Sequence, residues 1–155
     1  MTDPALRDDV SEEIGRHLQL TLAELIALSL AGKQLHWNVY GTQFLSLHRH
    51  LDEVVDEWRA LGDAVAERAA AVGIAPDGSA AAVVELADLG PLEPGFTEDR
   101  SASERLCAQL DDVAVRVRRR AELLGELDLV SQDVLVDVLR KLEEQRWIMR
   151  AQLAD

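Results

Sequence analysis

A long seam of apolar side chains between residues 44 and 72 constrains the fold more than any other feature of the sequence. Its members step by three and four positions: Phe44, Leu47, Leu51, Val54, Trp58, Leu61, Val65, Ala69 and Val72. Side chains at this spacing share one face of an α-helix, which turns once in about 3.6 residues. The seam predicts a helix over residues 42–72, with Thr42 as its N-cap and Gly73 at its end. A helix this long must bury its seam against other helices.

Three further segments have helical periodicity, with expected ranges of 4–39 (or 11–39), 97–127 (or 101–127) and 131–153. Asp3-Pro4 and Ser11 are alternative starts for the first helix, and Ser131 is a candidate N-cap for the last. One stripe of the first helix is expected to face the core: Ile14, Leu18, Leu22, Leu25, Ser29, Gly32 and His36.

Glycines and prolines interrupt residues 73–100, where only Ser79–Leu89 is periodic. This segment predicts a long crossover that contains one short helix. A short first turn, a long crossover and a short last turn are typical of an all-α, ferritin-like four-helix bundle. We therefore expect one domain over residues 1–155, with residues 1–10 as a short acidic N-terminal segment.

The charge and the single cysteine narrow the class of protein. The formal net charge is -13, whereas a nucleic-acid-binding domain usually carries a basic patch. Cys107 alone rules out an intrachain disulfide, and we expect it to be a buried apolar residue. No apolar run approaches the roughly 20 residues of a membrane span, and no signal peptide is visible. We expect a cytoplasmic protein without membrane contact, and association with the nucleoid stays open.

Four metal-binding side chains form a second stripe on the helix over residues 42–72. His48, Asp52, Asp63 and Glu67 are separated by 4, 11 and 4 positions. The stripe is centred about 130° around the helix from the apolar seam, so it faces away from the subunit's own core. Imidazole and carboxylate together suit iron and similar divalent ions. The alternative is a solvated face with no metal, because this helix carries other exposed charges.

The distance between these side chains along the helix axis determines whether one chain could supply all the ligands of a metal site. The midpoints of the two pairs, residues 50 and 65, lie 15 positions apart, or roughly 22 Å at 1.5 Å per residue. One ion cannot bridge that distance. Two copies of the helix that cross antiparallel about a two-fold axis would instead complete two identical sites. His36 lies as far before Thr42 as His48 lies after it, so a helical hairpin would bring the two imidazoles to a similar height.

The motif Glu-x-x-His, which di-iron bundles project into their core, occurs nowhere in the sequence. We therefore do not expect a di-iron centre within one subunit.

The run Lys33-Gln34-Leu35-His36-Trp37-Asn38-Val39, with the downstream His48, Asp52, Asp63 and Ala66-Glu67-Arg68-Ala69, resembles the Dps family, the DNA-binding proteins from starved cells. The resemblance covers nearly the whole chain. It implies a hollow shell of twelve subunits that oxidises Fe(II), often with hydrogen peroxide in preference to oxygen. It also implies storage of ferric mineral and protection against oxidative damage. The implied ferroxidase ligands are His36, His48 and Asp52 from one subunit and Asp63 and Glu67 from its neighbour.

The same resemblance implies two auxiliary features. Trp37 adjoins a ligand and is expected to quench stray oxidising equivalents, although it is more simply a packing residue. Asp128, Asp133 and Asp137 would line a three-fold iron pore. The alternative is that these carboxylates complement the helix dipole, which would suit Asp133 best.

Direct DNA binding is not expected, despite the family's name. The first ten residues contain Arg7 against three aspartates, and the last residues carry almost no basic tail. Arg116 and Arg118–Arg120 are the only candidate basic patch. A DNA-compacting protein with secondary iron chemistry and a helical assembly module without metal stay as alternatives.

Overall fold

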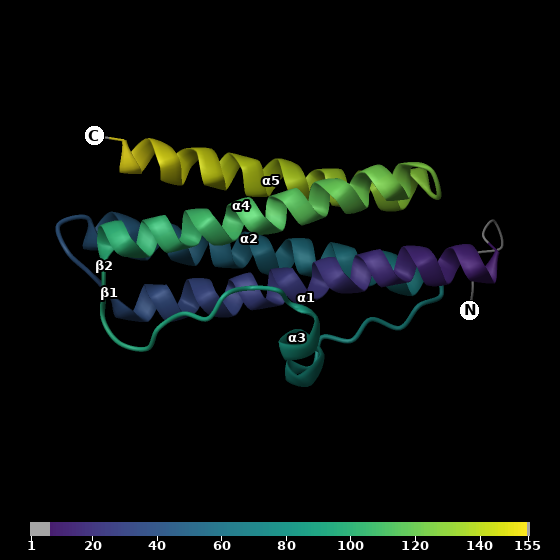
Figure 1. The fold of residues 1–155 in the computed structure, drawn as a ribbon, viewed down its shortest axis with the longest axis horizontal. Helices are drawn as coiled ribbons and strands as arrows, with labels where there is room; N and C mark the ends of the chain where they lie inside the picture. The colour runs from purple at the N-terminus through teal and green to yellow at the C-terminus, as the bar shows by residue number, and fades with distance from the viewer. Residues whose placement is uncertain (1–6, 155) are drawn as a thin grey trace.

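The computed structural model describes residues 7–154 and confirms the predicted bundle. Within that range the helices are α1 (Asp8–Asn38), α2 (Phe44–Ala71), α3 (Ala80–Leu86), α4 (Asp99–Gly125) and α5 (Leu129–Leu153). The four long helices pack side by side as two antiparallel hairpins, α1 with α2 and α4 with α5 (Figure 1). The crossover runs back along the bundle and carries α3 outside it.

The predicted apolar faces form the core. All seven members of the α1 stripe are buried, including the polar Ser29 and His36. The α2 seam is buried from Leu47 to Val72 except for the partly buried Leu61, while Phe44 at its start is 41% exposed. Trp58 is fully buried in the centre of the seam.

Three predicted N-caps are wrong. Arg7 is the N-cap of α1, and Ser11 lies buried inside the helix. The N-cap of α2 is Gln43 rather than Thr42. Asp128, not Ser131, caps α5, because its carboxylate accepts a hydrogen bond of 2.7 Å from the backbone N–H of Ser131. The alternative start at Asp3-Pro4, like most of the acidic N-terminal segment, lies outside the described residues.

The turn between α1 and α2 contains a feature that helical periodicity could not predict. Two short strands, β1 (Val39–Tyr40) and β2 (Thr97–Glu98), pair in parallel and join this turn to the end of the crossover. The buried Asp99 accepts a hydrogen bond of 2.6 Å from the backbone N–H of Gln43. A residue distant in sequence thus satisfies a free N–H at the start of α2.

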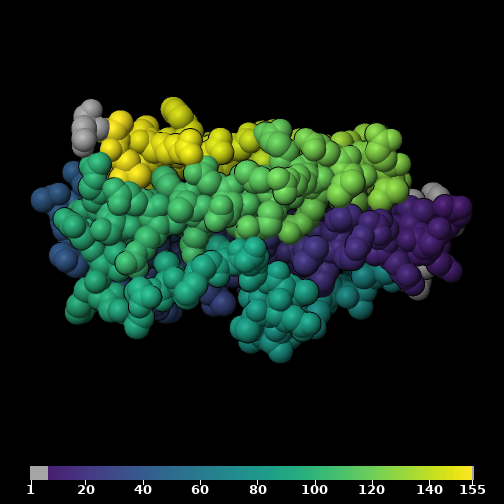
Figure 2. Space-filling view, in the orientation of Figure 1, coloured from purple at the N-terminus to yellow at the C-terminus, as the bar shows by residue number. Residues whose placement is uncertain are grey.

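The crossover packs against the outside of α1. Ser79 starts α3 as expected and accepts a hydrogen bond of 3.3 Å from the N–H of Ala82, and the helix ends at Leu86. The surface view shows the crossover and α3 lying against α1 (Figure 2). None of the described helices is both long enough and apolar enough to cross a membrane.

Candidate metal centre

His36 and His48 face each other where α1 turns into α2. Their rings are stacked, with centroids 3.7 Å apart and planes 19° from parallel. Nδ1 of His36 donates to the backbone carbonyl of His48 at 2.8 Å, and Nδ1 of His48 donates to the carbonyl of His36 at 3.0 Å. The expectation that the hairpin brings the two imidazoles to one height is confirmed.

This reciprocal bonding fixes which nitrogen of each ring is free. A carbonyl oxygen can only accept a hydrogen bond, so each Nδ1 must carry a proton. In the neutral imidazole the lone pair is then on Nε2. A carbonyl partner on the other nitrogen is the usual way in which proteins orient a metal-binding histidine. His36 and His48 therefore have the tautomer and the orientation of metal ligands.

Asp52 lies beside this pair, one turn further along α2. Its Oδ1 is 3.4 Å from Nδ1 of His36, and it also accepts a hydrogen bond from the ammonium group of Lys33. The hydrogen bond from Lys33 lowers the pKa of Asp52 below its usual value. Burial acts against this change, and the charges of His36, Lys33 and His48 add to it. The carboxylate is thus kept ionised next to the two imidazoles.

Asp63 and Glu67 are in the opposite condition. Both are exposed on α2, and neither makes a hydrogen bond or ion pair with the described part of the chain. Asp63 lines an open, largely apolar groove of about 380 Å³. Helices α1 and α2 form most of its walls, and Pro76 and Gly78 of the crossover complete them.

The five predicted ligands therefore fall into two groups. His36, His48 and Asp52 lie together, whereas Asp63 and Glu67 lie further along the same helix. Across residues 7–154, no group of three or more His, Cys, Asp or Glu side chains is arranged to hold a metal ion. A complete centre would need ligands from a second chain.

The other predicted site residues differ in their exposure and in their bonding partners. Trp37, next to His36, is 68% exposed. Asp133 is exposed, and Asp137 pairs with Arg140 one turn away. Asp128 is the N-cap of α5 and also binds Arg68 at 2.7 Å. The N-terminal carboxylate of this helix is thus supplied by Asp128 rather than by Asp133.

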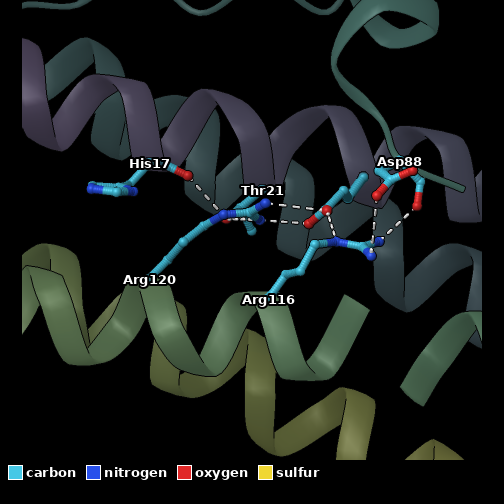
Figure 3. A network of polar contacts seen from close by, with 6 residues as sticks. His17, Thr21, Asp88, Arg116 and Arg120 are labelled. Carbon is cyan, nitrogen blue, oxygen red and sulfur yellow. Dashed lines mark hydrogen bonds and ion pairs between the residues drawn. The ribbon is translucent and has the colours of Figure 1, made fainter. Parts of the chain in front are cut away.

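In the candidate basic patch on α4, two of the four arginines are bound to a carboxylate of α1. Arg120 is buried and binds Glu24 at 2.5 Å, and Arg116 binds the same carboxylate at 2.5 Å. Arg116 also donates to the backbone carbonyl of Asp88 at 2.9 Å, so the network joins α1, α4 and the crossover (Figure 3). Arg118 pairs with Glu143 on α5.

Sequence reasoning missed Glu24, the centre of this network. Its only signal is one acidic residue within the apolar run Thr21–Leu30, and the arginines that bind it come more than 90 positions later. Because Glu24 is 1% exposed, it needs such partners.

Comparison with known proteins agrees with the fold. Residues 16–155 match the ferritin-like domain family. The DNA protection during starvation protein of Mycolicibacterium smegmatis is 33% identical over 156 residues, which cover 98% of this chain and 83% of that protein. The fine tangled pili major subunit of Haemophilus ducreyi is 38% identical over 154 residues, with coverages of 98% and 80%.

Solved structures agree as well. The structure titled Mycobacterium smegmatis Dps, tetragonal form, has a TM-score of 0.96 at 32% identity, covering 100% of this chain and 94% of that one. The Dps from Microbacterium arborescens in the high iron form has a TM-score of 0.91 at 30% identity, with coverages of 96% and 97%. Fold and family match together define a ferritin-like protein. Within that class, the chain belongs to the Dps family. Because a relative's name speaks of DNA protection, the expectation against direct DNA binding finds no support in these likenesses.

Proposed function

We propose that this protein is a Dps-type ferroxidase whose iron centres are each completed by two chains. The observation that carries the proposal is the contrast along α2. His36 and His48 have free, oriented Nε2 atoms, while Asp63 and Glu67 have no partner among residues 7–154. Roughly 22 Å separates the two groups along the helix. A second chain that runs antiparallel would bring each group to the other.

In such a pair, His36, His48 and Asp52 of one chain and Asp63 and Glu67 of the other bind the substrate Fe(II). Imidazole nitrogen and carboxylate oxygen together suit iron. Two Fe(II) ions each give up one electron to one molecule of hydrogen peroxide, whose O–O bond breaks to give two waters with two protons. Because both electrons go to one peroxide, no hydroxyl radical is released. Oxygen is a second oxidant.

We further propose that the chains form a hollow dodecamer that stores the ferric product. Large apolar side chains stay exposed on the single chain, including Phe96 at 82%, Leu129 at 75% and Trp147 at 68%. Exposed apolar surface of this kind supports burial between subunits. Asp128, Asp133 and Asp137 at the start of α5 would line an acidic entrance for iron. With this function, we expect the protein to act in the cytoplasm and to limit oxidative damage there.

Trp37 would accept oxidising equivalents that leave the centre without reacting with iron. Its support is position alone, since it adjoins His36 and is exposed.

The test measures Fe(II) oxidation with hydrogen peroxide and with oxygen, through the absorbance of the ferric product. His36→Ala and Asp63→Ala are each expected to lower the initial rate by about 100-fold, the upper range for perturbing a metal centre. His50→Ala and Asp56→Ala, which lie outside the proposed ligand set on the same helix, are the matched controls.

Mixed assemblies test the shared centre directly. When the two inactive variants are co-expressed in equal amounts, a pair that contains one of each has one intact centre and one doubly damaged centre. Random pairing should therefore restore about a quarter of the wild-type rate. If the mixture stays inactive although the subunits assemble together, the centres are not shared between chains and the proposal fails.

DNA binding is the second candidate, because a relative is named for DNA protection. Arg119 is the one member of the α4 arginine run that is exposed without a partner in the described residues. We expect no gel shift at low salt, since the net charge of -13 repels phosphates. A salt-sensitive shift that Arg119→Ala reduces would establish DNA binding as a function.

A further inference from the structure

The crossover segment beside Asp63 has no secondary structure of its own to hold it in place. Residues 74–79 form neither helix nor strand. Nevertheless, Pro76 and Gly78 provide one wall of the groove that Asp63 lines. The position of this wall must therefore come from contacts with the bundle.

Gln19 of α1 makes two of these contacts. Its side-chain Nε2 donates to the backbone carbonyl of Asp77 at 2.7 Å, and its Oε1 accepts from the backbone N–H of the same residue at 2.8 Å. An amide side chain carries its donor and its acceptor on neighbouring atoms, so it can bind the N–H and the carbonyl of one residue at once. Asp77 in turn accepts a hydrogen bond of 2.9 Å from the N–H of Ser79, the N-cap of α3.

Two glycines bring the same segment close to α1. A Cβ on Gly15, one turn before Gln19, would lie 2.5 Å from the side chain of Ile74. A Cβ on Gly78 would lie 3.3 Å from the side chain of Ile26. Residues 15, 19 and 26 of α1 thus fix three points of the crossover, and the double hydrogen bond of Gln19 is the polar one.

We infer that Gln19 is a positioning residue for the Asp63 half of the iron centre. It holds the wall at residues 76–78, and this wall shapes the groove through which the partner's ligands must approach Asp63. A displacement of about 1 Å is enough to impair a site that must meet ligands from another chain. The inference rests on the proposed sharing of centres between two chains.

The experiment uses Zn²⁺ as a redox-inert probe and counts high-affinity sites by calorimetry in assembled protein. Gln19→Ala alone should weaken Zn²⁺ binding by about tenfold, as expected for a residue that orients ligands from outside the metal's first shell. Gln19→Glu keeps the acceptor for the N–H of Asp77 but places a second carboxylate oxygen against the carbonyl of Asp77, so it should weaken binding at least as much. Gln109→Ala is the matched control, because Gln109 donates to Gly90 at 3.3 Å at the other end of the crossover.

Mixed assemblies show which half of the centre Gln19 serves. When Gln19→Ala chains are mixed with His36→Ala chains, the Gln19→Ala chain supplies an intact histidine half and its His36→Ala partner supplies an intact Asp63. About a quarter of the sites should therefore regain wild-type affinity. With Asp63→Ala, every site has either a missing Asp63 or an Asp63 in a disturbed groove, so none should. Gln109→Ala should regain wild-type sites with both partners.

The remaining outcomes separate the inference from the function on which it rests. Recovery with Asp63→Ala but not with His36→Ala would assign Gln19 to the histidine half, and recovery with neither would mean a general loss of structure. Either result overturns the inference, as does wild-type Zn²⁺ affinity in both Gln19 variants. Failure of His36→Ala and Asp63→Ala to complement each other would instead refute the shared centre itself.

Discussion

The two halves of the candidate centre lie on one helix and use similar chemistry, yet the chain treats them differently. In the histidine half, both rings of the stacked pair are held in place, because each ring is hydrogen-bonded to the backbone of the other residue. The acidic half, Asp63 and Glu67, is exposed and unbonded within the described residues. The histidine half is thus oriented by hydrogen bonds within the described residues, whereas the acidic half is left available to bind other groups.

The difference follows from how much each group destabilises the folded chain when it has no hydrogen-bond partner. A buried imidazole without a hydrogen bond is unfavourable, so His36, which is 8% exposed, must be bonded inside the subunit. An exposed carboxylate keeps its hydration and can stay unbonded until a metal and a second chain arrive. The acidic half can therefore be open without loss of stability.

Removing one ligand from each half should affect activity equally and stability unequally. His36→Ala and Asp63→Ala should both lower the rate of Fe(II) oxidation by about 100-fold. Only His36→Ala also removes a hydrogen bond and a stacked ring, so it alone should cost about 1 kcal/mol, or roughly 3 °C in the thermal midpoint. Equal midpoints for the two variants would remove the contrast.

Backbone substitutions should also separate the halves. Gly41, in the turn that brings His36 to His48, has a φ of +130°, and a Cβ there would overlap the Asp99 carboxylate. Gly41→Ala should lower the free energy of unfolding by about 2 kcal/mol. At Gly62, beside Asp63, a Cβ would meet only Leu22 at an ordinary 3.7 Å. Gly62→Ala should raise the thermal midpoint by about 3 °C, because Ala favours a helix interior over Gly, and a comparable loss in both variants would contradict the interpretation.

A cation adjoins the acidic half in the sequence but is bound elsewhere. Arg68 follows Glu67 directly, but its guanidinium binds Asp128 and donates to Ser131 at 2.9 Å. Asp128→Asn should release Arg68 toward Glu67 and weaken Zn²⁺ binding by about tenfold through repulsion. Glu143→Gln, which breaks a surface pair with Arg118 and lies outside the proposed iron entrance, is the control. Equal Zn²⁺ affinity in the two variants would contradict this role.

The Asp128→Asn substitution has a pH signature as well. Burial tends to raise the pKa of Asp128, but hydrogen bonds from Ser131 and Arg68 outweigh it and lower the pKa. A lowered pKa in the folded state stabilises the protein above the unfolded value of about 3.9, and this contribution disappears as the pH falls through the folded value. The stability difference between wild type and Asp128→Asn should therefore be full at neutral pH and vanish in acid.

The smallest expected effect is at Lys33, the cation of the histidine half. It holds the pKa of Asp52 low but also occupies that carboxylate. Lys33→Gln should tighten Zn²⁺ binding by about threefold at neutral pH, because a competing positive charge is gone. The acid limb of Zn²⁺ binding should shift to higher pH as the pKa of Asp52 rises. Lys141→Gln, which breaks a pair with Glu144, should change neither.

The helix ends show where local sequence rules reach their limit. Ser11, Thr42 and Ser131 are all good N-cap residues by type, yet none of them caps its helix. Asp128 caps α5 and at the same time pairs with Arg68, 60 positions earlier. The capping position depends on such distant partners, which residue type alone does not reveal.

The residue pattern alone was enough to predict the four long helices, their buried faces and the spacing that divides the ligands into two groups. These features follow from the period of the α-helix and its rise per residue, both of which are local. The folded chain was needed to show which imidazole nitrogens are free, that Glu24 binds two arginines of α4, and that Gln19 binds the crossover. Each of these depends on groups brought together by the fold from separate segments, in directions that a linear pattern does not contain.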